Sequence, residues 1–321
     1  MCAASALTLM GGTRAAFAQA SSAATYPSSP VRIIVPFAGG GALDAVARDV
    51  ARSLTQTLGQ SVFVENKPGA NAVIGTTQVA TSPPDGYTLL VTATAFVIVP
   101  SMAQNVTYDP IKDFVPVSNL TYVPQVLMVN ASSGINTLQE LIARLKAKPG
   151  ELSYGSGGAG TSSHMASELL ARQAGVKLIH VPYKGNAPAM IDLLGGRLFI
   201  MIDNISSVLE HLKSGRVKAL GVTSATRSPL LPDVPAISEI LPGYQASIFQ
   251  GVFAPAGTPP DIVEKLRVAI VKFTSDPANR DRYKQGATEL VGSEPGQFAR
   301  QVAAEMERWT DVVKRAGIKA D

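Results

Sequence analysis

The sequence predicts an α/β fold of two lobes, each a mainly parallel sheet flanked by helices. Strand-like apolar runs alternate with helical patterns along most of the 321 residues, which is typical of parallel sheets covered by helices. The alternation occurs in two successive series. Each series opens with a strand, a glycine-rich loop and a helix, at "IIVPFAGGGALD" (33–44) and "LSYGSGGAGTSSHM" (152–165). Two similar series indicate two lobes with a cleft between them.

The first series starts from "VRIIV" (31–35), whose β-branched composition predicts a buried strand. The following helix repeats apolar residues three and four positions apart from Leu43 to Leu58, and Gly59 ends it as a C-terminal cap. The remaining elements are strands at 61–66, within 82–94 after a Pro-Asp-Gly turn, and at 125–130, then a helix over 137–147 ended by Lys-Pro-Gly.

The second series repeats the alternation of strands and helices. Its expected strands are 152–154, 177–181, 198–202 and 218–223, and its helices are 162–174, 186–194 and one ending near Leu212. A proline-rich stretch (229–243) and a strand within 251–259 return the chain to the first lobe, and helices at 259–274 and 295–315 end it. We therefore expect lobe 1 to comprise residues 26–125 and 249–321, and lobe 2 to comprise 126–248.

The composition is that of a packed globular protein, with 46% hydrophobic and 16% charged residues. The net charge of +4 comes from 28 basic and 24 acidic residues, and no run of five basic residues occurs. We therefore expect no nucleic-acid partner. A mildly positive field helps to collect small anions.

Residues 1–25 are predicted to be a leader or signal remnant. An apolar segment (7–10) precedes "AAFAQA" (15–20), which offers small residues at A-x-A spacing. Cys2, the single cysteine, lies in this leader, so the exported chain is expected to have neither a disulfide nor a cysteine nucleophile. No run of 18 apolar residues follows, and we expect no membrane span.

The second glycine loop contains G-x-G-x-x-G at Gly155, Gly157 and Gly160. A dinucleotide site also needs an acidic residue at the end of the next strand, and residues 169–191 contain none. Because no G-K-[ST] follows a glycine loop either, we expect no nucleotide cofactor. Free N–H groups at a helix start still favour an anion. The alternative is an ordinary strand-to-helix turn with Thr161 or Ser162 as N-cap.

The first glycine loop, Phe37 to Gly41, also follows a strand and opens a helix, at the edge where ligands bind in open α/β sheets. Two such loops facing each other would hold a molecule with a negative group at each end. Asp44 lies in the first turn of the helix. Its expected role is to bond the N–H groups of the loop, and direct contact with a ligand amine is the alternative.

Other polar residues indicate no catalytic or metal site. His164 lies in a first helical turn, but no G-x-S-x-G elbow occurs, and the histidines at 164, 180 and 211 lack metal-ligand spacing. We interpret His164 as a helix-start or core histidine. Lys184 either pairs with an anion or is solvated, and Asp203 either faces the cleft or caps the next helix.

Several motifs in the same order resemble the solute-binding proteins of tripartite tricarboxylate transporters, the Bug-type family. They cover residues 26 to 321 and include "YPSSPVRIIVPFAGGGALDAVAR", "ENKPGANAVIG", "PPDGYTLL", "YDPIKDFVPV", "HVPYKGNAPAMIDLLGG", "VTSATRSPLLPDVPAISE" and "GVFAPAGTP". The resemblance implies an exported periplasmic protein of the two-lobed, type II periplasmic-binding-protein (Venus flytrap) architecture. Such a protein is a monomer without cofactor, metal or catalysis, and it delivers a small carboxylate to membrane permease subunits.

The resemblance also implies the ligand-binding residues. Those of the first lobe are Phe37, Ala38, Gly39, Gly40, Gly41 and Asp44, joined by the loop Ala93, Thr94, Ala95 and Phe96. Those of the second lobe are Ser156, Gly157, Gly158, Ala159, Gly160 and Thr161, with His164, Tyr183 and Asp203 nearby. The hinge is expected at two crossings, near 123–127 and 246–250.

Leu43, Val99 and Phe199 are more apolar than the usual residues of the family at these positions. This favours a mono- or dicarboxylate with an aromatic or alkyl body. Two other functions fit the sequence. One is a sensor component that presents the ligand to a membrane kinase, and the other is an enzyme that uses His164 with a neighbouring serine.

Overall fold

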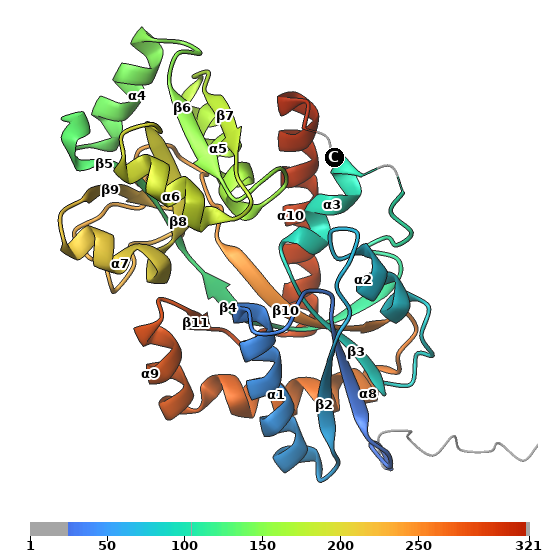
Figure 1. Cartoon of the computed structure of the whole chain (residues 1–321). Coiled ribbons are helices and arrows are strands. Elements are labelled where there is room, and N and C mark those ends of the chain that lie inside the picture. Colours follow the sequence, from blue (N-terminus) through green and yellow to red (C-terminus); the bar gives the residue numbers. More distant parts are fainter. Residues whose placement is uncertain (1–24, 104, 319–321) are drawn as a thin grey trace, which may run out of the picture.

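The computed structural model describes residues 25–103 and 105–318. It has two sheets, each with its own helices, which form one body at the upper left and another along the bottom and right of Figure 1. We call the body at the bottom and right, with six strands, the first lobe and the body at the upper left, with five strands, the second lobe. The predicted leader, Cys2 included, lies outside the described residues except for Thr25. Within the described ranges, no helix has the length and apolar character needed to cross a membrane.

The first-lobe sheet has the strand order β11-β4-β10-β3-β1-β2. Its strands are β1 (Val31–Val35), β2 (Val62–Asn66), β3 (Thr88–Ala93), β4 (Phe114–Val123), β10 (Ile248–Pro255) and β11 (Glu289–Leu290). β1 is parallel to β2 and β3, whereas β10 is antiparallel to β3 and β4. The C-terminal ends of β1 and β3 therefore lie at one edge of the sheet, and the loops that follow them are neighbours.

Helices cover both faces of this sheet. They are α1 (Ala42–Leu58), α2 (Val73–Ala80), α3 (Ala95–Met102), α8 (Pro260–Ser275), α9 (Pro277–Gln285) and α10 (Pro295–Ala316). α1 packs against α8, and their apolar faces join the sheet in one core cluster. α10 packs against α3 and β4 in a different cluster. The sheet is thus buried on both faces, as its apolar strands require.

The second-lobe sheet has the order β7-β6-β8-β5-β9. Its strands are β5 (Gln125–Asn130), β6 (Ser153–Ser156), β7 (Ile179–Pro182), β8 (Ile200–Asn204) and β9 (Val217–Val222). Its helices are α4 (Leu138–Ala147), α5 (Ser162–Ala174), α6 (Asn186–Leu194) and α7 (Ile205–Lys213). α5 begins after β6, so its N-terminus lies at the C-terminal edge of the parallel part of the sheet.

The two-lobed α/β class is confirmed, but the expectation of mainly parallel sheets is wrong, because both sheets are mixed. Parallel pairing is confined to β1, β2 and β3 and to β6, β7 and β8, which strand-helix-strand units connect. The strands next to the passages between the lobes, β4, β5, β9 and β10, pair antiparallel. A chain that leaves a sheet and later re-enters it has no crossover helix to impose a parallel direction.

The chain passes between the lobes at two places. β4 ends at Val123 in the first sheet and β5 begins at Gln125 in the second, so Pro124 alone separates them. The return runs from β9 to Ile248 at the start of β10. α10 of the first lobe also contacts α5 of the second, where Arg172 pairs with Asp311. The two lobes therefore meet through strands and through one long helix (Figure 1).

Candidate functional site

The first glycine loop is held in place by Asp44. This carboxylate is 5% exposed and accepts hydrogen bonds from Gly40 N (2.9 Å), Arg48 Nε (3.0 Å) and Asn66 Nδ2 (3.0 Å). The Arg48 hydrogen bond, with those from Gly40 and Asn66, lowers the Asp44 pKa to about 2. Asn66 also donates to Phe37 O at 3.1 Å. Asp44 thus bonds the loop N–H, as the structural role predicted for it requires.

Two helix N-termini beside this network have N–H groups without a partner among the described residues. Gly41 is the N-cap of α1 and makes no side-chain cap bond, and the N–H groups of Gly39 and Ala42 have no partner within residues 25–103 and 105–318. α3 also begins without a side-chain cap bond at its N-cap, Thr94, and the N–H group of Ala95 has no partner within the same described residues. Unpaired N–H groups at a helix start, with the positive end of the helix dipole, form a site for an anion.

Thr94, the N-cap of α3, has a tertiary role instead of a capping one. Its Oγ1 accepts a hydrogen bond from Phe249 N at 3.0 Å, which ties the start of α3 to β10. Thr94 is buried. The loop Ala93 to Ala95 is therefore rigidly placed beside the first glycine loop, and the N-termini of α1 and α3 converge there.

The second glycine loop satisfies much of its own backbone. Gly157 N donates to Ser163 Oγ (3.1 Å), Gly158 N to Ser156 Oγ (3.1 Å) and Gly160 N to His164 Nδ1 (3.0 Å). Thr161 caps α5 by accepting from the N–H of His164. The predicted alternative of a capped strand-to-helix turn is thus present, and fewer N–H groups are unpaired here than at the first loop.

His164 is a buried histidine, as predicted. It is 4% exposed, and its ring stacks on that of His180 with the ring centroids 3.9 Å apart. Burial, and secondarily the proximity of His180, lowers the pKa of His164 to about 4. The neutral ring accepts from Gly160 N through Nδ1, so its lone pair is occupied by the loop.

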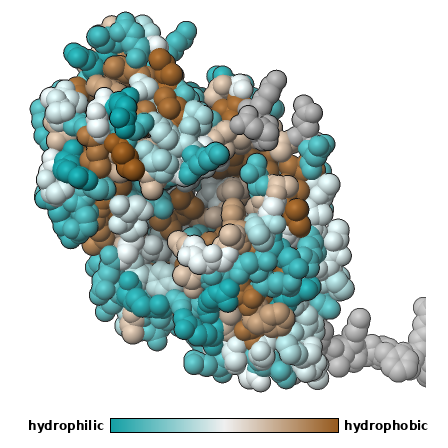
Figure 2. Space-filling model, viewed as in Figure 1, coloured by the Kyte–Doolittle hydropathy of each residue, from teal (hydrophilic) through white to brown (hydrophobic). Residues whose placement is uncertain are grey.

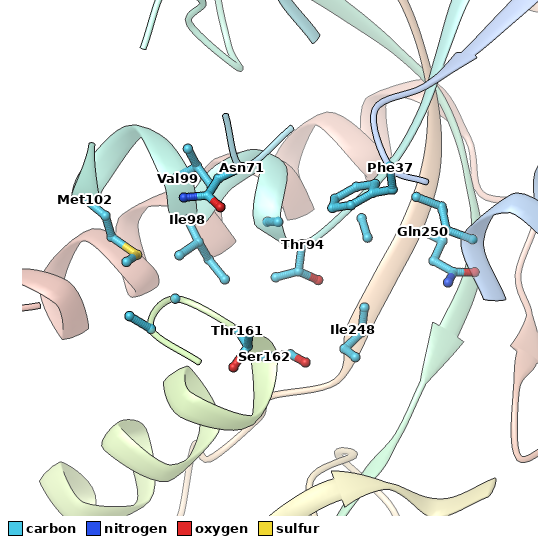
Figure 3. A pocket seen from close by; sticks show the side chains of 15 residues that line it. Phe37, Asn71, Thr94, Ile98, Val99, Met102, Thr161, Ser162, Ile248 and Gln250 are labelled. Carbon is cyan, nitrogen blue, oxygen red and sulfur yellow. The ribbon is translucent and has the colours of Figure 1, made fainter. Parts of the chain in front are cut away.

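A cavity of about 370 Å³ lies between the two glycine loops (Figure 3). The cavity opens into the hollow between the lobes, and the floor of this hollow is largely hydrophobic in Figure 2. Its walls are formed by Phe37, Leu43, Asn71, Ala93, Thr94, Ala95, Ile98, Val99, Met102, Ala159, Gly160, Thr161, Ser162, Ile248 and Gln250. Among these described wall residues no side chain is charged. The volume suits a small metabolite.

Seven predicted site residues line this cavity: Phe37, Ala93, Thr94, Ala95, Ala159, Gly160 and Thr161. The others on these loops do not line its wall, namely Ala38, Gly39, Gly40, Gly41, Ser156, Gly157 and Gly158. Phe96 is buried in the hydrophobic core instead. Asp44 and His164 lie behind these loops and bond them. Leu43 and Val99 do line the cavity, whereas Phe199 packs against the hydrophobic core.

Tyr183 and Asp203 lie elsewhere in the second lobe. Tyr183 donates its hydroxyl to Asp192 Oδ2 at 2.6 Å. Asp203 is buried, accepts from Asn204 N (2.7 Å) and from Asn186 Nδ2, and burial raises its pKa. It lines a separate hollow of about 670 Å³, which shares Thr161 and Ser162 with the first cavity.

Sequence reasoning missed several wall residues, among them Asn71, Ile98, Met102 and Gln250. Gln250 carried a signal, because it is a polar side chain inside the apolar strand "IFQGVFAP" (248–255). Ile98 and Met102 belong to α3, which the sequence pattern did not predict as a helix.

Residues 46–318 match the model of the tripartite tricarboxylate transporter family receptor. The chain belongs to this family. It is a solute-binding protein of the Bug type and not an enzyme.

Three relatives illustrate the similarity. Protein BugT of Bordetella pertussis (strain Tohama I) is 39% identical over 302 residues, covering 93% of this chain and 92% of BugT. The structure of the periplasmic binding protein BugD is 38% identical, with a TM-score of 0.73 over 92% of this chain and 100% of BugD. R. palustris Rpa4515 with adipate is 35% identical, with a TM-score of 0.75 over 92% of this chain and 99% of Rpa4515.

Proposed function

We propose that this protein is a periplasmic solute-binding protein that captures a small carboxylated metabolite between its lobes for membrane permease subunits. The observation that carries the proposal is the interlobe cavity, in which two helix N-termini converge on an apolar chamber. The similar protein Rpa4515 holds a carboxylate, adipate, and this supports the ligand class. A mono- or dicarboxylate with an aromatic or alkyl body suits Leu43, Ile98 and Val99 in the walls.

The physical case rests on main-chain donors. Because no lysine or arginine lines the described walls, we expect a carboxylate to be held by uncharged donors, chiefly the N–H groups at the starts of α1 and α3, where Leu43 and Ala95 line the wall. A hydrogen bond to a charged group contributes about 1.5–3 kcal/mol, and more where water is excluded. A few such bonds, with burial of an apolar body, reach the roughly −8 kcal/mol of micromolar binding.

Capture requires the lobes to close on the ligand. We propose a hinge at the two crossings, Pro124 and the residues before Ile248, with lobe 1 formed by residues 26–125 and 249–321 and lobe 2 by 126–248. Neither Pro124 nor the residues directly before Ile248 belong to a helix, so a change of backbone angles there breaks no helix. The protein acts as a monomer, since one chain contains both walls of the cavity.

Thermal shift assays with matched acids and amides test the proposal. Carboxylates are expected to raise the melting temperature, because they bind only the folded chain, whereas their neutral primary amides are not. Isothermal titration calorimetry then gives the affinity of each acid that stabilises the protein. Equal shifts from acid and amide would remove the role of the anion, and no shift from any carboxylate would refute the ligand class.

A further inference from the structure

We propose that Gln250 is a specificity-determining residue that donates a hydrogen bond from Nε2 to an oxygen of the ligand, and that the site selects acids without an ammonium group. This inference rests on the proposed function and deepens it. It concerns which substituent the acid carries beside its carboxylate. Hydroxy and oxo acids present an oxygen acceptor there, whereas amino acids present a cationic donor.

The fold fixes Gln250 at the cavity wall. In the register of the first sheet, Gln250 on β10 lies opposite Thr121 on β4 and Ala93 on β3. Ile248 and Gln250, two residues apart, both line the cavity, while Phe249 between them is buried in the core. The side chain of Gln250 therefore projects from a central strand, beside the loop that begins α3.

Thr121 sets the orientation of the amide. Its Oγ1 donates to Gln250 Oε1 at 2.9 Å, and Thr121 is fully buried. Gln250 is only 5% exposed, and its Nε2 has no partner within residues 25–103 and 105–318. In Figure 3 the nitrogen of this amide lies on the side of Ile248 and the cavity, and the oxygen points away. Nε2 is not among the fully buried polar atoms of the described residues that lack a partner, so it stays accessible from the cavity and is available to donate to an acceptor on the ligand.

The surroundings of Gln250 are unfavourable for a cation. Neither aspartate nor glutamate occurs among the described residues of the cavity wall. Asp44, in the first turn of α1, does not line the cavity, and its oxygens already accept from Gly40, Arg48 and Asn66. An ammonium group at this place would thus meet the Gln250 N–H group and the N-termini of α1 and α3. All of these carry partial positive charge, and no carboxylate of the described wall is there to pair with the cation. Burying such an unpaired cation is strongly unfavourable.

Two matched series of acids test the inference by calorimetry. The first is phenylacetate, mandelate and phenylglycine, and the second is succinate, malate and aspartate. Within each series the body is constant and the substituent is hydrogen, hydroxyl or ammonium. In the series that binds, the hydroxy acid is expected to bind most tightly, and the amino acid at least a hundredfold more weakly. An amino acid that binds as tightly as its hydroxy partner would overturn the inference while leaving the proposed function standing.

Variants separate binding from folding. Gln250→Leu is expected to weaken the hydroxy acid about tenfold, which corresponds to 1.4 kcal/mol, and the unsubstituted acid much less. Gln250→Glu places a carboxylate at the same position and is expected to reverse the preference in favour of the amino acid. A merely structural role for Gln250 predicts neither change of selectivity, and equal losses for all acids in both variants would refute the assignment.

Thr121→Val tests the positioning of the amide. Removal of the hydroxyl frees the Gln250 amide to rotate, so the ratio of hydroxy-acid to unsubstituted-acid affinity is expected to fall toward one, whatever the effect on melting temperature. An unchanged ratio would show that Thr121 does not orient Gln250. If no carboxylate binds the wild-type chain at all, the proposed function fails, and this inference fails with it.

Discussion

Substitution of Gly160 by alanine separates the stability of the second glycine loop from closure of the lobes. Gly160 has φ +75°, a left-handed conformation that favours glycine. A Cβ at this position would lie 2.6 Å from Met102 Cε and 2.8 Å from Met102 Sδ. Met102 belongs to α3 of the first lobe, so this contact exists across the cavity, whereas the backbone strain is internal to the loop.

The two costs have different magnitudes and different consequences. The left-handed backbone costs alanine about 1–2 kcal/mol in every folded conformation, which lowers the melting temperature by roughly 2–8 °C. The Met102 contact arises only when the lobes are close. Forcing that side chain off its rotamer costs about 0.5–1.5 kcal/mol, so ligand affinity is expected to fall about twofold to tenfold.

Gly175→Ala is the matched control. Gly175 caps α5 at φ +64°, and a Cβ added there would have no atom within 4 Å, so this position carries the strain without the contact. Thermal melts should show similar losses for both variants, and calorimetry should show weaker binding only for Gly160→Ala. Because Met102 itself lines the cavity, the contact is tested in a Met102→Ala background, where Gly160→Ala should no longer weaken binding but should still lower the melting temperature. If Gly160→Ala binds its carboxylate as tightly as Gly175→Ala does, the closure argument is wrong.

Two further predictions concern the buried polar groups behind the loops. Asp44→Ala leaves the donors on Gly40, Arg48 and Asn66 without their acceptor, so we expect the free energy of unfolding, measured by urea titration, to fall by about 2–3 kcal/mol. Ligand binding is expected to weaken as well, because the Gly40 N–H is no longer held. An unchanged urea midpoint would contradict this prediction. The His164 pKa is about 4 when folded and 6.5 in the reference state, so the unfolded chain binds the proton first and stability falls as pH drops from about 6.5 to 4, by up to about 3 kcal/mol. His164→Gln should lose the His164 part of this slope and keep the part due to His180, whose pKa burial also lowers, whereas His211→Gln should keep the full slope. Identical pH profiles for the two variants would refute the assignment.

The helices of the second lobe were the easiest elements to predict, because local signals mark both ends. α5 starts after the Thr161 cap and ends at Gly175, and the predicted bounds 162–174 are those of the structure. α6 likewise matches 186–194. Where capping residues and apolar spacing agree, the sequence determines the element without tertiary information.

Other elements lacked such signals. α3 is apolar on every side and contains Pro100, so "AFVIVPSM" resembles the end of a strand more than a helix. α2 begins at Val73, after the N-cap Ala72, which has a left-handed conformation and makes no side-chain cap bond. β4 contains a proline and several buried polar residues, and its pairing with β10 is irregular. In each case tertiary packing overrides local preference.

The candidate site also has a part that local sequence predicts and a part that only tertiary structure brings together. Its glycine loops were visible in the sequence because strand, loop and helix are contiguous there. Its remaining walls come from α3 and β10, which are far apart in the chain and adjacent only through sheet pairing and the bond from Phe249 N to Thr94. The hydrogen bond between Thr121 and Gln250 likewise depends on strand register, which no local pattern reveals.

The helix α10 offers a place to observe capture directly. It packs on α3 and β4 in one lobe and on α5 in the other, where Leu169, Arg172 and Gln173 face Arg308 and Asp311 across a groove. When the second lobe turns, this groove must widen or narrow while α10 stays with its own lobe. An environment-sensitive dye attached at Gln173 would therefore change its emission on occupancy without touching the solute, which turns the protein into an optical reporter of its own ligand.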